Sequence, residues 1–176
     1  MKKKLIIFTD IGDTIVDEGT EVRHVPGGVV LRAGCIPGAK EAMLSLYEEG
    51  YTIAMVADGL VESFHNTMTQ NGLEHIFAAK AISEALGVEK PHEKMFQAAM
   101  DALGLTDADK HRIIMVGNNK ARDVLGANRF GITSVHLTWS PRYNHTAEND
   151  LEQADYRIGS PDELPRLVRM LNEKLG

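Results

Sequence analysis

Acidic, amide and lysine side chains follow the apolar runs of this sequence, at the points where strands are expected to end. The residues at these points are Asp10, Asp58, Lys90, Asn118 and Asp123. The run before Asp10, residues 5–8, is continuously apolar, which predicts a strand buried on both faces. In an open α/β sheet, ligands bind in the crevice beyond the carboxyl ends of the strands. We therefore expect these side chains to share one pocket.

The segments that must position these side chains alternate between strand and helix patterns. Apolar runs predict strands at 5–8, 51–57, 78–82, 112–116, 133–137 and 156–158. Helical spacing with Gly or Pro at the ends predicts helices over 37–50, 63–71, 93–103, 120–128 and from 160 onward. Such units, joined by right-handed crossovers, give an α/β fold in which a doubly wound, Rossmann-like parallel sheet is covered by helices on both faces.

One additional element is expected close after Asp10. Two short extended arms, 21–25 and 29–32, surround Pro26-Gly27-Gly28 and predict a small β-hairpin flap. Residues 139–155 are polar and are expected to form a loop.

Length and composition favour one domain spanning residues 1–176. Apolar residues make up 43% and charged residues 25%, close to a globular average. The net charge of -6, without a basic stripe, argues against nucleic-acid binding, and no segment approaches a membrane span. The single Cys35 excludes an internal disulfide and a cysteine zinc cluster, so a cytoplasmic location is predicted.

Three motifs, taken together and in order, resemble those of the haloacid dehalogenase-like superfamily of phosphohydrolases. They are Asp10-Ile11-Gly12-Asp13-Thr14, Lys90-Pro91, and Gly117-Asn118-Asn119 followed after three residues by Asp123. The resemblance covers nearly the whole chain. It implies hydrolysis of a phosphate monoester through an aspartyl-phosphate intermediate, with Mg²⁺ as cofactor.

The resemblance also implies a role for individual residues. Asp10 matches the nucleophile, Lys90 the lysine that neutralises the transferring phosphoryl group, and Thr14 the threonine of the first motif. The metal ligands implied are Asp10, the backbone carbonyl of Gly12, Asn118 and Asp123. The residues expected to bind substrate are Asp58, Gly59 and Asn119.

Three departures from the family pattern each remove a functional group. Gly12 stands where most phosphatases of the family carry an Asp that protonates the leaving group and later activates water. Ala57 replaces a phosphate-binding Ser or Thr, and Asn118 replaces the first acid of the metal loop. We therefore expect slow turnover limited by dephosphorylation, which Gly12→Asp would accelerate. Whether Asp13 or Asp58 compensates is left open by the sequence.

The gaps between the motifs are too short for the cap domains that many members of the family carry. An open site of this capless type implies a bulky or macromolecular phosphoester, or a neighbouring subunit of a homo-oligomer that covers the entrance. The same departures support a second hypothesis, a non-catalytic module that binds phosphate or a partner. Carbon–halogen hydrolysis by Asp10 is a third, because dehalogenases of the family also lack the second acid.

Overall fold

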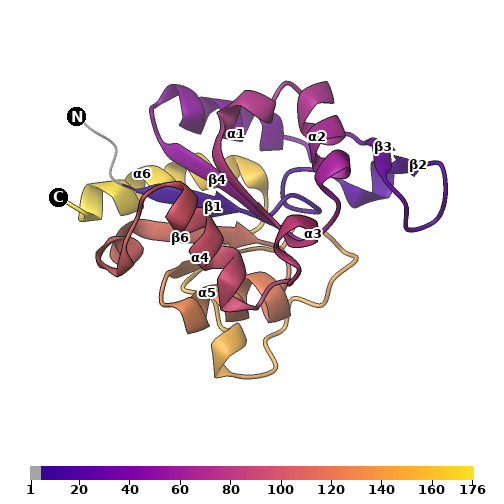
Figure 1. The fold of residues 1–176 in the computed structure, drawn as a ribbon. Helices are drawn as coiled ribbons and strands as arrows, with labels where there is room; N and C mark the ends of the chain where they lie inside the picture. Colours follow the sequence, from indigo (N-terminus) through magenta and orange to yellow (C-terminus); the bar gives the residue numbers. More distant parts are fainter. Residues whose placement is uncertain (1–4) are drawn as a thin grey trace.

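The computed structural model describes residues 5–176 and is built around a six-stranded parallel sheet (Figure 1). Its strands are β1 (Ile6–Thr9), β4 (Thr52–Ala57), β5 (Phe77–Ile82), β6 (Ile113–Gly117), β7 (Thr133–Leu137) and β8 (Tyr156–Ile158). Their order is β5-β4-β1-β6-β7-β8, so β1 lies between β4 and β6, with Ile7 opposite Ile53 and Ile114. The predicted doubly wound α/β fold is confirmed.

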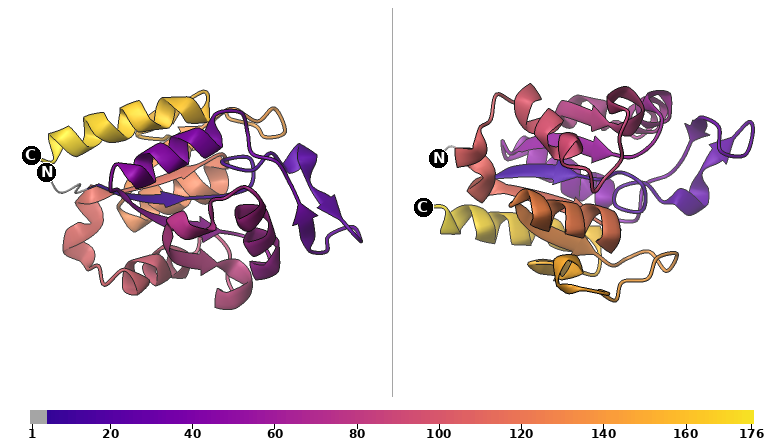
Figure 2. Two further views of the ribbon diagram at one scale, coloured as in Figure 1. Left: turned by 90° about the horizontal axis from the view of Figure 1, so that it is seen from above. Right: turned by 60° about the horizontal axis from the view of Figure 1, so that its bottom comes forward.

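Helices cover both faces of this sheet, as the two views of Figure 2 show. The helices are α1 (Ala39–Glu48), α2 (Val61–Gln70), the short α3 (Ser83–Leu86), α4 (Glu93–Ala102), α5 (Leu125–Phe130) and α6 (Leu164–Lys174). Successive residues of β1 point to opposite faces. Ile7 packs in a cluster with residues of α1, α2 and α6, and Phe8 packs in a second cluster with residues of α4 and α5. Both faces of the central strands are buried, which explains their continuous apolar runs.

A two-stranded hairpin extends from the carboxyl ends of the strands, away from the body of the protein (Figure 2). Its strands, β2 (Val22–Arg23) and β3 (Val30–Arg32), are shorter than the predicted arms. The hairpin is fastened to α2, because the Val30 N–H donates to Ser63 Oγ (2.9 Å) and Asn66 Nδ2 donates to the Val30 carbonyl (3.1 Å). Within residues 5–176 no cap domain interrupts the sheet, and the hairpin lies beside the strand ends.

The structure adds short turns of helix that hydrophobic periodicity does not predict. Turns of 3-10 helix occupy Glu18–Thr20, Glu74–Ile76, Asp107–Arg112, Asp150–Glu152 and Pro161–Glu163. One of these lies in the segment predicted to be only a polar loop. The helix predicted over 120–128 begins instead as a π-helical turn, Lys120–Val124, before α5. This π-helical turn lies in the segment that carries Asp123. In proteins generally, such turns are frequent at functional sites.

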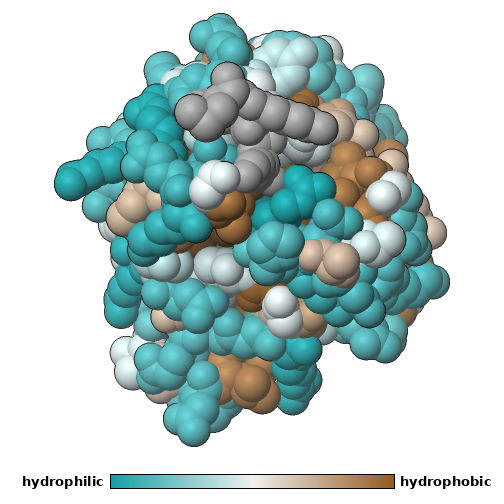
Figure 3. All heavy atoms as spheres, turned by 90° about the vertical axis from the view of Figure 1, so that its left-hand side faces the viewer, coloured by the Kyte–Doolittle hydropathy of each residue, from teal (hydrophilic) through white to brown (hydrophobic). Residues whose placement is uncertain are grey.

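The opposite end of the molecule, where the strands begin, has a mainly hydrophilic surface with scattered apolar groups among its described residues (Figure 3). There the Leu5 N–H donates to Asn172 Oδ1 of α6 (3.0 Å), which ties the start of β1 to the last helix. Among the helices of residues 5–176, none has the length and apolar composition needed to cross a bilayer.

Candidate active site

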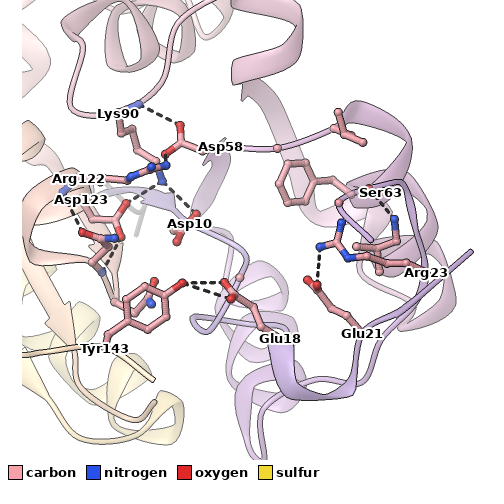
Figure 4. Close-up of a pocket in the computed structure, with 18 residues that line it drawn as sticks. Asp10, Glu18, Glu21, Arg23, Asp58, Ser63, Lys90, Arg122, Asp123 and Tyr143 are labelled. Atoms are coloured by element: carbon pink, nitrogen blue, oxygen red, sulfur yellow. Dashed lines mark hydrogen bonds and ion pairs between the residues drawn. The ribbon is translucent and has the colours of Figure 1, made fainter. Parts of the chain in front are cut away.

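A cavity of about 550 Å³ lies at the carboxyl ends of the strands, and it contains nearly all the residues predicted from the sequence (Figure 4). The predicted residues that line it are Asp10, Gly12, Asp58, Gly59, Lys90, Asn118, Asn119 and Asp123. They come from the segments after β1, β4 and β6 and from the turn before α4. The expectation that these strand ends share one pocket is confirmed.

Lys90 lies between two carboxylates at the buried end of this cavity. Its Nζ donates to Asp10 Oδ1 (3.0 Å), to Asp123 Oδ1 (2.7 Å) and to the Val56 carbonyl (2.8 Å). Burial alone would lower the pKa of Lys90, but the charges of Asp10, Asp123 and Asp58 outweigh burial and raise that pKa. The side chain therefore carries a positive charge where a phosphoryl group would meet Asp10.

Asp10 is, with Asp123, an acid of this cavity that contacts Lys90 Nζ. Burial raises the pKa of its carboxyl to about 7, and the neighbouring Asp123 adds to this increase while Lys90 opposes it. Its backbone N–H donates to the Val116 carbonyl (2.9 Å), so β6 holds the residue at the end of β1. Lys90 contacts Oδ1 of this carboxylate. The second oxygen, Oδ2, faces other groups.

Those groups are the side chain of Asn118 and the backbone carbonyl of Gly12. One end of the Asn118 amide lies 3.1 Å from Asp10 Oδ2 and 3.1 Å from the Gly12 oxygen. With its oxygen at that end, the amide accepts from Thr14 Oγ1 (3.3 Å), and three oxygens converge. With its nitrogen there, the amide donates to both neighbours. The hydrogen bonds of the metal-free protein are therefore satisfied when the amide nitrogen faces Asp10 and Gly12.

The three converging oxygens fit a magnesium ion. Octahedral Mg²⁺ holds its ligands at about 2.1 Å, which places adjacent oxygens about 3.0 Å apart. The two separations from the Asn118 amide, to Asp10 Oδ2 and to the Gly12 oxygen, are both 3.1 Å and match that edge. Carboxylate, amide and carbonyl oxygens are also the ligand types that Mg²⁺ takes. Among the described residues no group of three His, Cys, Asp or Glu side chains forms a metal cluster. Of the three oxygens above, only that of Asp10 comes from an acid.

Asp123, the fourth ligand implied by the resemblance, contacts other groups of the protein, and metal binding by this residue stays a prediction. Its Oδ1 accepts from Lys90 and its Oδ2 accepts from the Asn119 N–H (3.0 Å). The side chain packs so closely on Gly117 that a Cβ built there would lie 2.2 Å from Asp123 Cγ. These contacts make Asp123 the residue that holds Lys90 and the loop after β6 in place.

The predicted substrate-binding residues line the cavity but bond to the protein. Asp58 Oδ1 accepts from the Lys90 N–H (2.9 Å) and Oδ2 from Arg122 (3.2 Å). The Gly59 N–H donates to Ser83 Oγ (2.8 Å). The side chain of Asn119 accepts from two N–H groups of the turn that follows and so serves as a helix cap. Their contacts position the cavity wall, and direct binding of substrate stays a prediction.

Two polar residues of the first motif, Thr14 and Asp13, lie outside the cavity. Thr14 is buried, and its hydroxyl contacts Asn118 rather than the cavity, which is a positioning contact. Asp13 adopts a left-handed backbone (φ 48°) and accepts from Arg142 at 2.7 and 2.9 Å and from Ser140 (2.7 Å). Burial alone would raise the pKa of Asp13, but these hydrogen bonds outweigh it and lower that pKa. Asp13 therefore does not substitute for the acid absent at Gly12.

The cavity also contains residues that the sequence did not single out. Glu18 and Tyr143 face each other, and the Tyr143 hydroxyl lies 3.1 and 3.2 Å from the two Glu18 oxygens. Burial raises the pKa of Glu18 and raises that of Tyr143 to about 12. Arg122 is half-exposed and pairs with Asp58 and Glu89, both at 3.2 Å. Of these three residues, only Arg122 could have been found from the sequence, because it directly precedes Asp123.

Known proteins are similar to this chain in sequence. A family model described as haloacid dehalogenase-like hydrolase matches residues 31–137. A glyceraldehyde 3-phosphate phosphatase of Pyrococcus furiosus is 33% identical over 80% of this chain and 56% of its own length. The Methanopyrus kandleri protein of the same name is 31% identical over 77% of this chain and 57% of its own length. The chain thus spans little more than half the length of these relatives.

Solved structures agree with the sequence comparison at the level of the fold. An uncharacterized protein from Listeria monocytogenes serotype 4b superposes with a TM-score of 0.77 at 22% identity, covering 96% of this chain and 99% of that one. With the family model matched over more than half of the sequence and the strand-end motifs gathered in one cavity, the chain belongs to the haloacid dehalogenase-like hydrolases.

Proposed function

We propose that the chain hydrolyses phosphate monoesters, with Asp10 as nucleophile and Mg²⁺ bound by Asp10, the Gly12 carbonyl and Asn118. The observation that carries this proposal is that the two oxygens of the Asp10 carboxylate face different groups. Its Oδ1 accepts from the buried Lys90, and its Oδ2 lies in the set of oxygens spaced for a magnesium ion. A carboxylate arranged in this way can approach a phosphate without strong charge repulsion.

In the proposed reaction an Asp10 oxygen attacks phosphorus, and the bond from phosphorus to the leaving oxygen breaks. Water then attacks the aspartyl phosphate and releases inorganic phosphate. Lys90 offsets the negative charge of the transferring group, and Asp123 and Asp58 keep Lys90 in position. When bound, Mg²⁺ would orient a phosphate oxygen and neutralise its charge.

The substrate that this site would accept is a phosphorylated compound reached from solvent. Two relatives are named for a small sugar phosphate, and a cavity of about 550 Å³ can hold a molecule of that class. The hairpin is the element placed to contact the part of the substrate beyond the phosphate. The single Cys35, whose pKa burial raises to about 11, supports a reducing cytoplasmic environment.

The test is release of inorganic phosphate from an aryl phosphate and from a panel of small phosphate monoesters. We expect turnover with millimolar Mg²⁺, none with excess EDTA, and a loss of at least about 10³-fold in Asp10→Asn, because the amide is a far weaker nucleophile. Asp107→Asn, the same change at an exposed surface acid, is the matched control. Equal rates for wild type and Asp10→Asn would contradict the proposal.

A second candidate function is supported by the other orientation of Asn118. When the amide nitrogen donates to Asp10 Oδ2 and to the Gly12 carbonyl, these oxygens are satisfied without a cation, which suits a non-catalytic binding module. Binding of phosphoesters by calorimetry, without turnover of any substrate, would favour that module. Chloride release from a 2-haloacid in EDTA would instead indicate the dehalogenase reaction.

A further inference from the structure

The carboxylate of Glu18 occupies the place where a side chain at position 12 would begin. A Cβ built on Gly12 would lie 2.3 Å from Glu18 Oε1 and 3.1 Å from Glu18 Cδ. No side chain larger than hydrogen fits there while Glu18 keeps this conformation. A carboxylate is therefore present beside the Asp10 loop although residue 12 has none.

The backbone of Glu18 is fixed by buried groups. Its N–H donates to Asp13 Oδ1 (3.0 Å), and Asp13 is in turn held by Arg142 and Ser140. Asp17 caps the turn in which Glu18 lies. The left-handed Asp13 and its buried contacts thus direct the chain so that Glu18 returns toward Gly12.

The carboxylate of Glu18 faces the same cavity as Asp10. Figure 4 shows Glu18 and Tyr143 together on the side of Asp10 away from Lys90. Tyr143 has one hydroxyl proton, so it can donate to one Glu18 oxygen at a time and leave the other available. Within residues 5–176, Glu18 forms no ion pair with a Lys, Arg or His side chain. One oxygen of Glu18 is thus able to exchange a proton with a molecule in the cavity.

The other acids near Asp10 lack this freedom. Asp13 accepts four hydrogen bonds within the protein. Asp58 accepts from the Lys90 backbone and from Arg122, and Asp123 accepts from Lys90 and from the Asn119 N–H. Glu18 is the cavity carboxylate next to the nucleophile loop that is not held by a cation.

We infer that Glu18 is the general acid and base of the phosphoryl transfer proposed above, an assignment that rests on that function. In the first step an Asp10 oxygen bonds to phosphorus, the bond to the leaving oxygen breaks, and that oxygen takes the proton of the Glu18 carboxyl. In the second step a water oxygen bonds to phosphorus and gives a proton to the Glu18 carboxylate, while the bond from phosphorus to Asp10 breaks. Glu18 returns to its starting form and phosphate leaves.

The decisive experiment compares Glu18→Gln with wild type on two leaving groups in rapid-mixing kinetics at saturating Mg²⁺. An alkyl phosphate needs a proton at its departing oxygen, whereas 2,4-dinitrophenyl phosphate does not. We expect Glu18→Gln to slow the first step on the order of 10²-fold or more for the alkyl ester and less than about tenfold for the dinitrophenyl ester. The dinitrophenyl ester should then give a burst of phenolate near one equivalent, because hydrolysis of the aspartyl phosphate has lost its base.

Glu41→Gln is the matched control, because Glu41 is an exposed carboxylate of α1 that does not line the cavity. We expect it to leave the leaving-group dependence unchanged. Equal losses for both esters in Glu18→Gln, or no loss for either, would overturn the assignment of Glu18 while leaving the phosphatase proposal intact. A wild type that hydrolyses neither ester would overturn the proposed function, and this assignment with it.

A second test moves the carboxylate from position 18 to position 12. It looks for a gain of activity and does not depend only on the activity lost in Glu18→Gln. In Gly12→Asp alone the Glu18 carboxylate has to move away from the new Cβ, so the acceleration expected from the sequence should be smaller than in a protein that lacks the Glu18 side chain. In the double variant Gly12→Asp/Glu18→Ala that space is open, and we expect dephosphorylation at least about tenfold faster than in Glu18→Ala. Circular dichroism and urea unfolding establish that each variant is folded. A folded double variant no faster than Glu18→Ala, together with unaffected Glu18→Gln, would refute the assignment.

Discussion

Replacing Asn118 by Asp should strengthen magnesium binding and, at the same time, lower the unfolding free energy of the metal-free protein. The side chain of Asn118 ends 3.1 Å from Asp10 Oδ2 and 3.1 Å from the Gly12 oxygen. A carboxylate in that position adds a negative charge where only one acid now faces the proposed ion. Mg²⁺ is a hard cation whose affinity depends on the number of charged oxygen ligands, so the substitution favours the bound state.

The size of both effects follows from the same separation. Two carboxylates 3.1 Å apart repel by about 5 kcal/mol at an effective dielectric constant of about 20. Asp10, whose pKa is about 7, relieves part of this repulsion by taking up a proton near neutral pH. We therefore expect the metal-free variant to lose about 1 to 3 kcal/mol of unfolding free energy. Mg²⁺ removes the repulsion, so its dissociation constant should fall at least about tenfold, equivalent to about 1.4 kcal/mol.

The assay is titration calorimetry with Mg²⁺, accompanied by urea unfolding in EDTA and in saturating Mg²⁺. Asn119→Asp is the control, because it adds the same charge one residue away, at a helix cap where Asp serves as well as Asn. We expect Asn119→Asp to change Mg²⁺ affinity by less than about threefold, since its charge is not next to Asp10. Unchanged Mg²⁺ binding in Asn118→Asp, or equal tightening in both variants, would refute the magnesium site described above.

Two further substitutions test the buried charges around the site. In EDTA, Lys90→Met should destabilise the protein by about 3 to 5 kcal/mol at pH 9 in urea unfolding, because two buried carboxylates lose their shared cation. The loss should shrink toward pH 6. The folded pKa of Asp10 lies above its unfolded value, so proton uptake at lower pH favours the folded state. A loss that does not change with pH would contradict this explanation. Asp13→Asn, which tolerates the left-handed backbone, should cost about 2 to 3 kcal/mol near pH 7. The folded pKa of Asp13 is lowered, so its contribution is complete above about pH 5 and disappears as the pH falls through that lowered pKa. Asp17→Asn, at a half-buried acid that also pairs with Arg142, should change stability by less than about 1 kcal/mol, and equal losses in the two variants would count against the role of Asp13.

The residues that the sequence could place are those at the ends of strands. Continuous apolar runs identified the strands, and a parallel sheet with right-handed crossovers brings all the carboxyl ends to one edge. For that reason Asp10 and Lys90, 80 residues apart, could be assigned to one pocket before their contact was known. Hydrophobic periodicity is a local property of the chain and locates each strand. The parallel topology then predicts which strand ends lie together, without any knowledge of side-chain packing.

What only the tertiary structure decided is which polar groups bond to one another. Asp13 was a candidate replacement for the missing acid, yet it accepts two hydrogen bonds from Arg142, which lies in the segment predicted to be a polar loop. Glu18 gave no signal, because its place beside Gly12 depends on a turn of 3-10 helix and on Tyr143, 125 residues away. Hydrogen bonds between loops depend on backbone conformations that no periodic pattern encodes, so the folded structure alone shows which carboxylate is left to exchange a proton.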